Sequence, residues 1–237
     1  MSDRARAVTF DFGQTLAEMD AAMLSRRLRE RGVEVAVERL EAATPSAWSA
    51  YNKGVRAGLG GHPWRLLMDT LLAGAGVEEG RAAHVEWLWT EQPRVNLWRR
   101  PIAGMIELVR DLRAAGVPVG VVSNSEGGLS VLVDEMGWTD DLPVVADSGR
   151  LGIEKPSTEI FRWTAERLGV ALEDCVHVGD AWAADYVGAL DAGMRAVLFR
   201  GRASLVEGDA HLSNPRGAAC EDAEALRAIL RAWSLPV

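Results

Sequence analysis

Ionisable and hydroxyl side chains follow the apolar runs of this chain at the points where those runs end. In an open parallel sheet, ligands bind at the carboxyl ends of the strands, so residues at these points are candidates for chemistry. They comprise three carboxylates, one ammonium, two hydroxyls and one amide: Asp11, Asp180, Asp185, Lys155, Thr15, Ser123 and Asn124. We expect these side chains to converge on one edge of a sheet.

The charges in this group indicate a metal site that serves phosphoryl transfer. Clustered carboxylates repel one another unless a cation is present, and hard oxygen ligands of this kind favour Mg²⁺. Lys155 would neutralise an anionic group beside them, while hydroxyls and helix amino termini can hold phosphate oxygens. Asp11 lies between Phe10 and Phe12, where a carboxylate needs a charged partner or a metal. The set suits a reaction in which Asp11 is a nucleophile that forms an aspartyl-phosphate.

Several of these residues also have a purely structural interpretation, whereas Asp11 is harder to explain in that way. Asp180, Ser123 or Asn124 could cap the helix that follows it, and Lys155 could be a surface residue. His177 lies inside an apolar run, and we interpret it as a hydrogen-bonded core histidine rather than as a ligand. The ordered set as a whole, rather than any single member, favours the chemical interpretation.

The pattern of apolar runs predicts an α/β fold that positions these residues. Strands are expected at residues 7–12, 117–122, 143–146, 175–178 and 196–199. Helices are expected at residues 102–115, 127–136, 156–168, 182–192 and 221–233. Strands that alternate with helices of roughly 10–15 residues indicate a parallel, Rossmann-like sheet flanked by helices.

Residues 17–100 show helical periodicity without alternation typical of strands. Helices are expected at residues 20–31, 37–43, 45–57, 63–73 and 78–91, with a glycine-rich loop at 57–61. Thr44 followed by Pro45 has the pattern of a helix N-cap with proline at the first helical position. We therefore predict a core domain of residues 1–16 and 101–237, interrupted by an all-helical domain of residues 17–100.

Composition and charge exclude several classes of partner. The chain has 237 residues and a net charge of −8, which argues against nucleic acid or an anionic membrane as the main partner. Its 2 cysteines are too few for a disulfide scaffold. No stretch approaches the roughly 20 apolar residues of a membrane span, and the first ten residues lack the apolar core of a signal peptide. We expect a cytoplasmic protein that is a monomer or a homodimer.

Four motifs together resemble the haloacid dehalogenase-like (HAD) hydrolase superfamily over about residues 7–200. They are Asp11-Phe12-Gly13-Gln14-Thr15-Leu16, Ser123-Asn124, Lys155-Pro156 and Gly179-Asp180 with Asp185. The helical insertion between the first two motifs resembles the family's C1-type cap. The resemblance implies that this cap selects the substrate.

The resemblance also implies a role for each matching residue. Asp11 would be the nucleophile and a Mg²⁺ ligand, Asp180 would bind Mg²⁺, and Asp185 would orient that metal shell or add to it. Gly13 would supply a metal ligand through its backbone carbonyl. Lys155 would stabilise the charge of the phosphoryl group and of Asp11. The phosphoryl group itself would be held by Thr15, Ser123 and Asn124.

Gly13 is a departure from the family pattern. Family phosphatases place an aspartate at this position, where it protonates the leaving alcohol and then activates the hydrolytic water. General acid–base help of this kind is worth about 10²–10⁴-fold. Either the protein is a slow phosphatase, or its substrate needs no such acid, or another group replaces it. The candidates for replacement are Gln14, Glu18 and His62.

We expect a Mg²⁺-dependent phosphatase that acts on a small phosphorylated metabolite. One alternative is a module of the same fold that binds phosphorylated ligands or proteins with little turnover. Another is a phosphonatase-like enzyme, in which Lys53, the lysine of the helical insertion, would form a Schiff base with an aldehyde substrate. A dehalogenase is the third alternative, although that branch usually replaces the residue found here as Asp180 and needs no metal.

Overall fold

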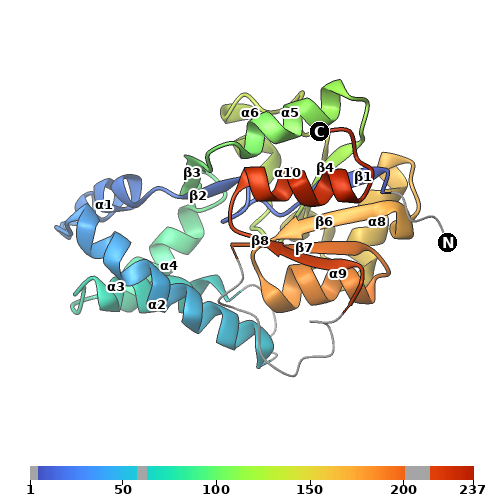
Figure 1. The fold of residues 1–237 in the computed structure, drawn as a ribbon. Coiled ribbons are helices and arrows are strands. Elements are labelled where there is room, and N and C mark those ends of the chain that lie inside the picture. Colours follow the sequence, from blue (N-terminus) through green and yellow to red (C-terminus); the bar gives the residue numbers. More distant parts are fainter. Residues whose placement is uncertain (1–4, 58–62, 201–213) are drawn as a thin grey trace. The chain divides into compact units, whose positions relative to one another are not determined.

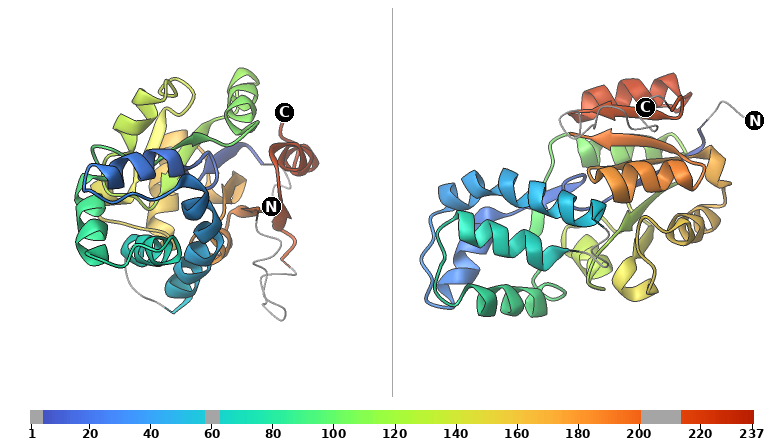
Figure 2. Two further views of the ribbon diagram at one scale, coloured as in Figure 1. Left: turned by 90° about the vertical axis from the view of Figure 1, so that its left-hand side faces the viewer. Right: turned by 90° about the horizontal axis from the view of Figure 1, so that it is seen from below.

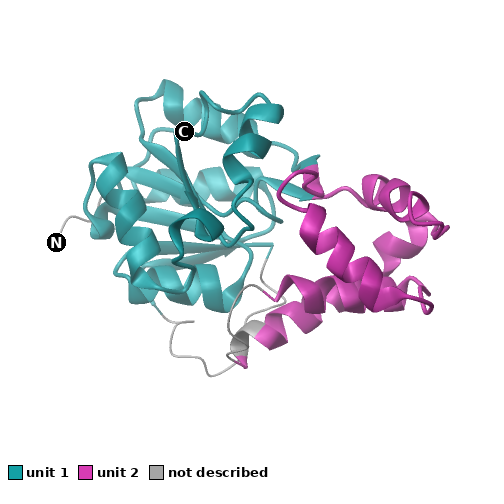
Figure 3. Ribbon diagram, turned by 180° about the vertical axis from the view of Figure 1, so that it is seen from behind, with its two compact units in different colours: residues 1–18, 100–237 teal, residues 19–99 magenta. Residues whose placement is uncertain are grey.

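The computed structural model describes residues 5–57, 63–200 and 214–237. The chain separates into two compact units (Figure 3). The first, which we call the α/β unit, comprises Met1–Glu18 and Arg100–Val237, and the second, the helical unit, comprises Met19–Arg99.

The described part of the α/β unit is built on a six-stranded parallel sheet (Figure 1). Its strands follow the order β5-β4-β1-β6-β7-β8. Their bounds are β1 Ala7–Phe10, β4 Val119–Ser123, β5 Val144–Asp147, β6 Cys175–Gly179, β7 Arg195–Phe199 and β8 Gly217–Cys220. All four residues of β1 are buried, as expected for a central strand covered on both faces.

Helices cover both faces of this sheet (Figures 1 and 2). Helix α5 (Met105–Ala114) packs on β4 and on α10 (Ala223–Ala232), whereas α8 (Thr158–Leu168) packs on β4 and β5 from the opposite side. The remaining helical segments are α6 Leu129–Glu135, α7 Ser148–Leu151, η1 Leu172–Asp174, η2 Trp182–Val187 and α9 Gly188–Asp191. The arrangement confirms the predicted α/β, Rossmann-like fold class.

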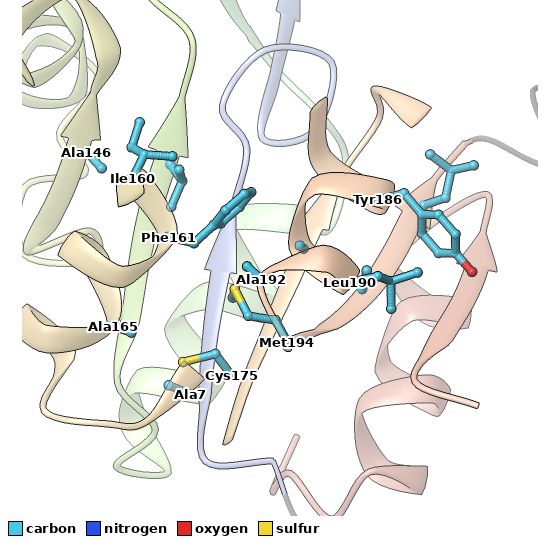
Figure 4. Packing of buried hydrophobic residues seen from close by; sticks show 14 of the residues in the cluster. Ala7, Ala146, Ile160, Phe161, Ala165, Cys175, Tyr186, Leu190, Ala192 and Met194 are labelled. Atoms are coloured by element: carbon cyan, nitrogen blue, oxygen red, sulfur yellow. The ribbon is translucent and has the colours of Figure 1, made fainter. Parts of the chain in front are cut away.

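A hydrophobic cluster fills the space between the sheet and the helices α8 and α9 (Figure 4). Phe161 of α8 and Met194, which precedes β7, are both buried in it. The cluster holds β6 and the segment after it against the helical layer. This rigid backing is what positions the polar residues at the ends of the strands.

Strand β8 was not predicted from the sequence, and its composition explains why. It consists of Gly-Ala-Ala-Cys, which lacks the β-branched and aromatic residues that indicate a strand. A Cβ atom added at Gly217 would collide with the hydroxyl of Tyr186, so a small residue is required at the start of this strand.

Two further strands contradict the expectation that residues 17–100 contain helices alone. Strand β2 (Ala17–Met19) pairs with β3 (Trp98–Pro101), and the division between the two units falls within both strands. Segments of 3 and 4 residues are too short to show a clear alternation. The pairing is reinforced by backbone hydrogen bonds from Ile102 N to Leu16 O (2.9 Å) and from Asp20 N to Leu97 O (2.8 Å).

The described residues of the helical unit between β2 and β3 form the helices α1 Ala21–Arg29, α2 Val37–Arg56, α3 Trp64–Gly74 and α4 Arg81–Glu91. Asp20 caps α1 by accepting a hydrogen bond from Met23 N at 2.8 Å. Most of the predicted loop at 57–61 lies outside the described residues. None of the described helices is long and apolar enough to cross a membrane.

Helix α2 corrects the prediction of two helices separated at Thr44. The helix continues through Pro45, although an interior proline costs about 3 kcal/mol. Thr44 does not act as an N-cap: its Oγ1 donates to Leu40 O, one turn earlier, at 2.9 Å. The buried side of α2 packs closely on α3, where a Cβ added at Gly74 would lie 2.9 Å from Ala43 Cβ. Tertiary packing therefore outweighs the local signal to end the helix.

Candidate active site

Asp11 follows the central strand of the sheet. Its backbone N–H donates to Val178 O at 2.8 Å, which extends the pairing of β1 with β6 by one residue. The side chain is buried, with the residue only 7% exposed. Strands β4 and β6 flank β1 on either side, so the residues that follow these two strands are the nearest neighbours of Asp11 along the sheet edge.

The segment after Asp11 folds into a tight turn. Both Leu16 N and Ala17 N donate to Phe12 O, at 2.9 and 3.0 Å, and Gln14 adopts a left-handed conformation with φ of 58°. The turn buries Thr15 completely. Thr15 Oγ1 has no hydrogen-bond partner in the structure, which is unusual for a buried hydroxyl and leaves it able to donate to a ligand.

Lys155 joins two of the carboxylates. Its Nζ donates to Asp11 Oδ1 at 2.7 Å and to Asp185 Oδ1 at 2.5 Å, and its side chain is only 2% exposed. The backbone of Lys155 is held by the side chain of Asn124, whose Nδ2 donates to Lys155 O at 3.0 Å and whose Oδ1 accepts from Lys155 N at 2.8 Å. The predicted phosphate-binding residue Asn124 thus fixes the loop that carries the lysine.

Asp185 lies on η2, a π-helical segment that follows β6. Its Oδ2 accepts from Ala181 N at 2.8 Å, and its Oδ1 is 3.1 Å from His177 Nε2. A Cβ atom added at Gly179 would collide with the Asp185 carboxyl group, so glycine is needed at that position for Asp185 to approach the strand end. π-helical turns of this kind are frequent at functional sites.

Asp180 completes a group of three carboxylates with Asp11 and Asp185. One oxygen from each of these residues lies within 4.8 Å of the others. Burial and the charges of Asp11 and Asp185 raise the pKa of Asp180 well above its ordinary value. Burial also raises the pKa of Asp11, an effect that Lys155 opposes. Without a bound cation, ionisation of these clustered carboxyl groups is therefore energetically unfavourable.

The ion pair of Lys155 and Asp185 is stabilised in its charged form. Burial alone would lower the pKa of Lys155, but Asp11 and Asp185 outweigh it and leave that pKa above its ordinary value. Burial would likewise raise the pKa of Asp185, but Lys155 and His177 hold it below its ordinary value. One ammonium cannot balance three ionised carboxylates, so the cluster fits an additional cation.

The donors in this cluster fit Mg²⁺. They are carboxylate oxygens, which hard divalent cations prefer, and the group contains neither a thiolate nor an imidazole in the ligand set. Gly13 follows Asp11 by two residues in the turn that leads to Thr15.

The structure thus brings Asp11, Lys155, Asp180 and Asp185 together. Ser123 is buried at the end of β4, the strand next to β1.

Among the groups considered as replacements for an acid at Gly13, Glu18 is engaged in two ion pairs. It is paired with Arg100 at 3.1 Å and with Arg200 at 3.5 Å. His62 lies outside the described residues, and Lys53 is exposed on α2.

One polar contact of the site does not follow from the sequence. His177, interpreted from the sequence as a hydrogen-bonded core residue, is hydrogen-bonded as expected, but one of its partners is Asp185. Glu126, in the loop that follows Ser123, has a pKa raised to about 7 by burial and by nearby Asp147.

Comparison with known proteins assigns the chain to a family. The model of the haloacid dehalogenase-like hydrolase family matches residues 5–193. The chain therefore belongs to the haloacid dehalogenase-like hydrolases, and the resemblance seen in its motifs is confirmed.

Individual relatives agree with this assignment. The haloacid dehalogenase-like hydrolase domain-containing protein 3 of Bos taurus is 28% identical over 207 residues, which cover 83% of this chain and 82% of that protein. The glyceraldehyde 3-phosphate phosphatase of Methanothermobacter thermautotrophicus is 32% identical over 114 residues, which cover 46% of this chain and 49% of that protein. Among solved structures, the HAD-hydrolase YfnB of Bacillus subtilis, bound to magnesium, has a TM-score of 0.70 at 18% identity and covers 96% of this chain and 99% of that chain. At this identity the structural likeness shows the fold alone.

The raised pKa of Asp180 generates a prediction for stability. A group whose folded-state pKa is raised binds its proton more tightly in the folded state, so its contribution to stability is lost as pH rises through that pKa. We therefore expect Asp180→Asn to raise the melting temperature of the metal-free protein at neutral pH, by about 2–4 °C for each kcal/mol gained. The same substitution should remove the stabilisation that Mg²⁺ gives the wild type.

Thermal unfolding with a chelator and with Mg²⁺ measures both effects. The control is Asp140→Asn, which makes the same change at an exposed position and should alter neither melting temperature. An Asp180→Asn protein that gains as much from Mg²⁺ as the wild type would contradict a metal site at this cluster.

Proposed function

We propose that this protein is a Mg²⁺-dependent phosphoric monoester hydrolase that acts on a small phosphorylated metabolite through an aspartyl-phosphate on Asp11. The observation that carries the proposal is the buried Asp11 carboxylate, which Lys155 contacts at one oxygen and which lies beside Asp180 and Asp185. The similarity to a glyceraldehyde 3-phosphate phosphatase over about half of the chain supports phosphate esters as the substrate class.

The reaction begins with attack by an Asp11 carboxylate oxygen on the phosphorus atom of the substrate. A bond forms between this oxygen and phosphorus while the bond from phosphorus to the alcohol oxygen breaks, and the alkoxide leaves with the electron pair and takes up a proton from solvent. A water oxygen then bonds to the phosphorus of the aspartyl-phosphate while the bond from phosphorus to the Asp11 oxygen breaks. This step releases inorganic phosphate, returns a proton to solvent and restores the Asp11 carboxylate.

Asp11, Asp180 and the carbonyl oxygen of Gly13 are proposed to hold Mg²⁺, with Asp185 orienting that shell or adding to it. When bound, the ion supplies positive charge that offsets the charge of the phosphoryl oxygens and of Asp11. The close approach of Asp11, Asp180 and Asp185, together with the raised pKa of Asp180, supports a cation at this position.

The other residues of the site are proposed to act on the phosphoryl group. Lys155 stabilises negative charge that develops on it, and Thr15 and Ser123 hold its oxygens. The buried and unpartnered Oγ1 of Thr15 supports this role, because a phosphate oxygen would accept its hydrogen bond. Asn124 contributes by fixing the backbone of Lys155.

Gly13 favours one competing function, a module that binds phosphorylated ligands with little turnover. Without an acid at this position, a poor leaving group departs as an unprotonated alkoxide, which slows the first step. The intact pairing of Asp11 with Lys155 supports the enzyme instead, because binding alone needs no buried nucleophile.

The presence of Asp180 favours a metal-dependent phosphatase over a dehalogenase. We also predict that the helical unit is a C1-type cap and that it selects the substrate.

Turnover of p-nitrophenyl phosphate tests the proposal. Its leaving group needs little protonation, so the absence of an acid at Gly13 should cost little with this substrate. We expect hydrolysis that requires Mg²⁺ and that falls by roughly 10⁴-fold or more in Asp11→Asn, as is typical when a nucleophile is removed. Asp140→Asn again serves as the matched control and should retain the wild-type rate. Turnover that persists in Asp11→Asn, or is absent from the wild type with every phosphate ester tried, would overturn the proposal.

Restoring the missing carboxylate tests the role of Gly13. The backbone of Gly13 lies outside the left-handed region, so it can carry a side chain without backbone strain. We expect Gly13→Asp to accelerate the hydrolysis of alkyl phosphates, by up to about 10²–10⁴-fold, and to have less effect on p-nitrophenyl phosphate. Gly13→Asn has the same shape but transfers no proton, and it should give no acceleration. An unchanged rate in Gly13→Asp would mean that another group already serves as the acid.

A further inference from the structure

Two polar side chains lie behind the site, inside the otherwise apolar strands β1 and β6. Thr9 and His177 are direct partners in the parallel register of these strands, and they are 1% and 0% exposed. The ring of Phe161 packs edge-on against His177 at 5.1 Å between centroids. A buried imidazole and hydroxyl in such surroundings are costly unless their hydrogen bonds are made, so their partners indicate why they are there.

The hydrogen bonds of His177 define its tautomer. Its Nε2 lies 3.1 Å from Asp185 Oδ1, and its Nδ1 lies 3.0 Å from Thr9 Oγ1. His177 is completely buried, where a neutral imidazole with a single N–H is less costly than a charged one. The ionised Asp185 can only accept, so this N–H is at Nε2. Nδ1 then accepts from the Thr9 hydroxyl at 3.0 Å, a shorter contact than the 3.4 Å from the same hydroxyl to Val176 O.

This tautomer connects the interior of the sheet to the nucleophile. Asp185 Oδ1 accepts from His177 Nε2 and also from Lys155 Nζ, and the same Nζ donates to Asp11 Oδ1. Asp185 Oδ2 is held separately by Ala181 N. The carboxylate of Asp185 is therefore fixed from three directions, and only the contact with His177 comes from within the sheet.

We propose that His177 and Thr9 are positioning residues: Thr9 holds the Nε2–H tautomer of His177, and His177 fixes Asp185 so that Lys155 is aligned on Asp11. Groups that orient the ligands of a metal site typically contribute about 10–100-fold to activity or metal affinity. The hydrogen bonds of these two residues go to Asp185, to each other and to Val176 O, rather than to Asp11. The catalytic consequence rests on the proposed phosphatase function, whereas the tautomer and the fixed carboxylate do not.

The tautomer itself is measured by nitrogen NMR of the imidazole rings in the metal-free protein at neutral pH. The chain has 4 histidines, and the signals of His177 are identified by their loss in His177→Gln. We expect a neutral ring with a protonated Nε2 and an unprotonated Nδ1. In Thr9→Val, which keeps the shape of the side chain but removes the hydroxyl, we expect the Nδ1 signal to shift, whereas Thr9→Ser should retain the wild-type signal. An Nδ1–H tautomer or an imidazolium in the wild type would overturn the proposal.

Kinetics with p-nitrophenyl phosphate measure the effect on the site. His177→Leu should lower kcat by about 10–100-fold, in the range typical of orienting residues, and should leave KM close to the wild-type value. His177→Gln carries an N–H at the position of Nε2 and should recover most of the loss. Thr9→Val should lower kcat less than His177→Leu does, with Thr9→Ser close to the wild type.

A purely structural role predicts a different result. Val109→Ala truncates a fully buried residue of α5 and lowers stability without touching this network, so it should leave kcat unchanged. If His177→Gln shows no recovery, or if Val109→Ala lowers kcat as much as His177→Leu does, positioning by His177 is refuted. Absence of turnover in the wild type would refute the phosphatase function instead, and the NMR result would still decide whether the Thr9–His177–Asp185 contact exists.

Discussion

The site depends on the pairing of the buried Lys155 ammonium group with the carboxylates of Asp11 and Asp185. Removing charges from water costs several kcal/mol per ion, and only close pairing with further hydrogen bonds offsets that cost. Here the lysine meets both carboxylates at hydrogen-bond distance, and Asp185 receives two more hydrogen bonds from the protein. The pair is therefore tolerated in the interior, and it holds the Asp11 carboxylate in one place.

The fold provides this arrangement through several independent supports. The central position of β1 places Asp11 between the ends of β4 and β6. Asn124, after β4, holds the backbone of Lys155, while Gly179 and the π-helical turn after β6 allow Asp185 to reach the same point. Three segments far apart in the sequence thus supply one charged cluster. That cluster carries an excess of negative charge, and this excess is the physical reason to expect a cation in it.

The sequence predicted those parts of the structure whose signal is local. Asp11 and Asp180 were recognisable because each follows an apolar strand, and Lys155 because it precedes a helix in the same α/β pattern. The continuous helix α2 was not predicted, since its packing on α3 overrides the signal of Thr44 and Pro45. Strands β2, β3 and β8 are too short or too poor in β-forming residues to be seen. The contact of His177 with Asp185 depends on the turn after β6, and its contact with Thr9 depends on the order of the strands, so sequence spacing could not show the connection.

The central claim is that Asp11 becomes phosphorylated during turnover, and reductive trapping tests it most directly. The protein is mixed with Mg²⁺ and a phosphate ester, quenched in acid within one turnover and treated with borohydride, which reduces an acyl phosphate to the alcohol. Mass spectrometry of the peptide that contains Asp11 then identifies the product. We predict homoserine at position 11, formed only when substrate and Mg²⁺ are both present. Reduction at another carboxylate, or an unmodified Asp11 in a protein that is turning over, would contradict it.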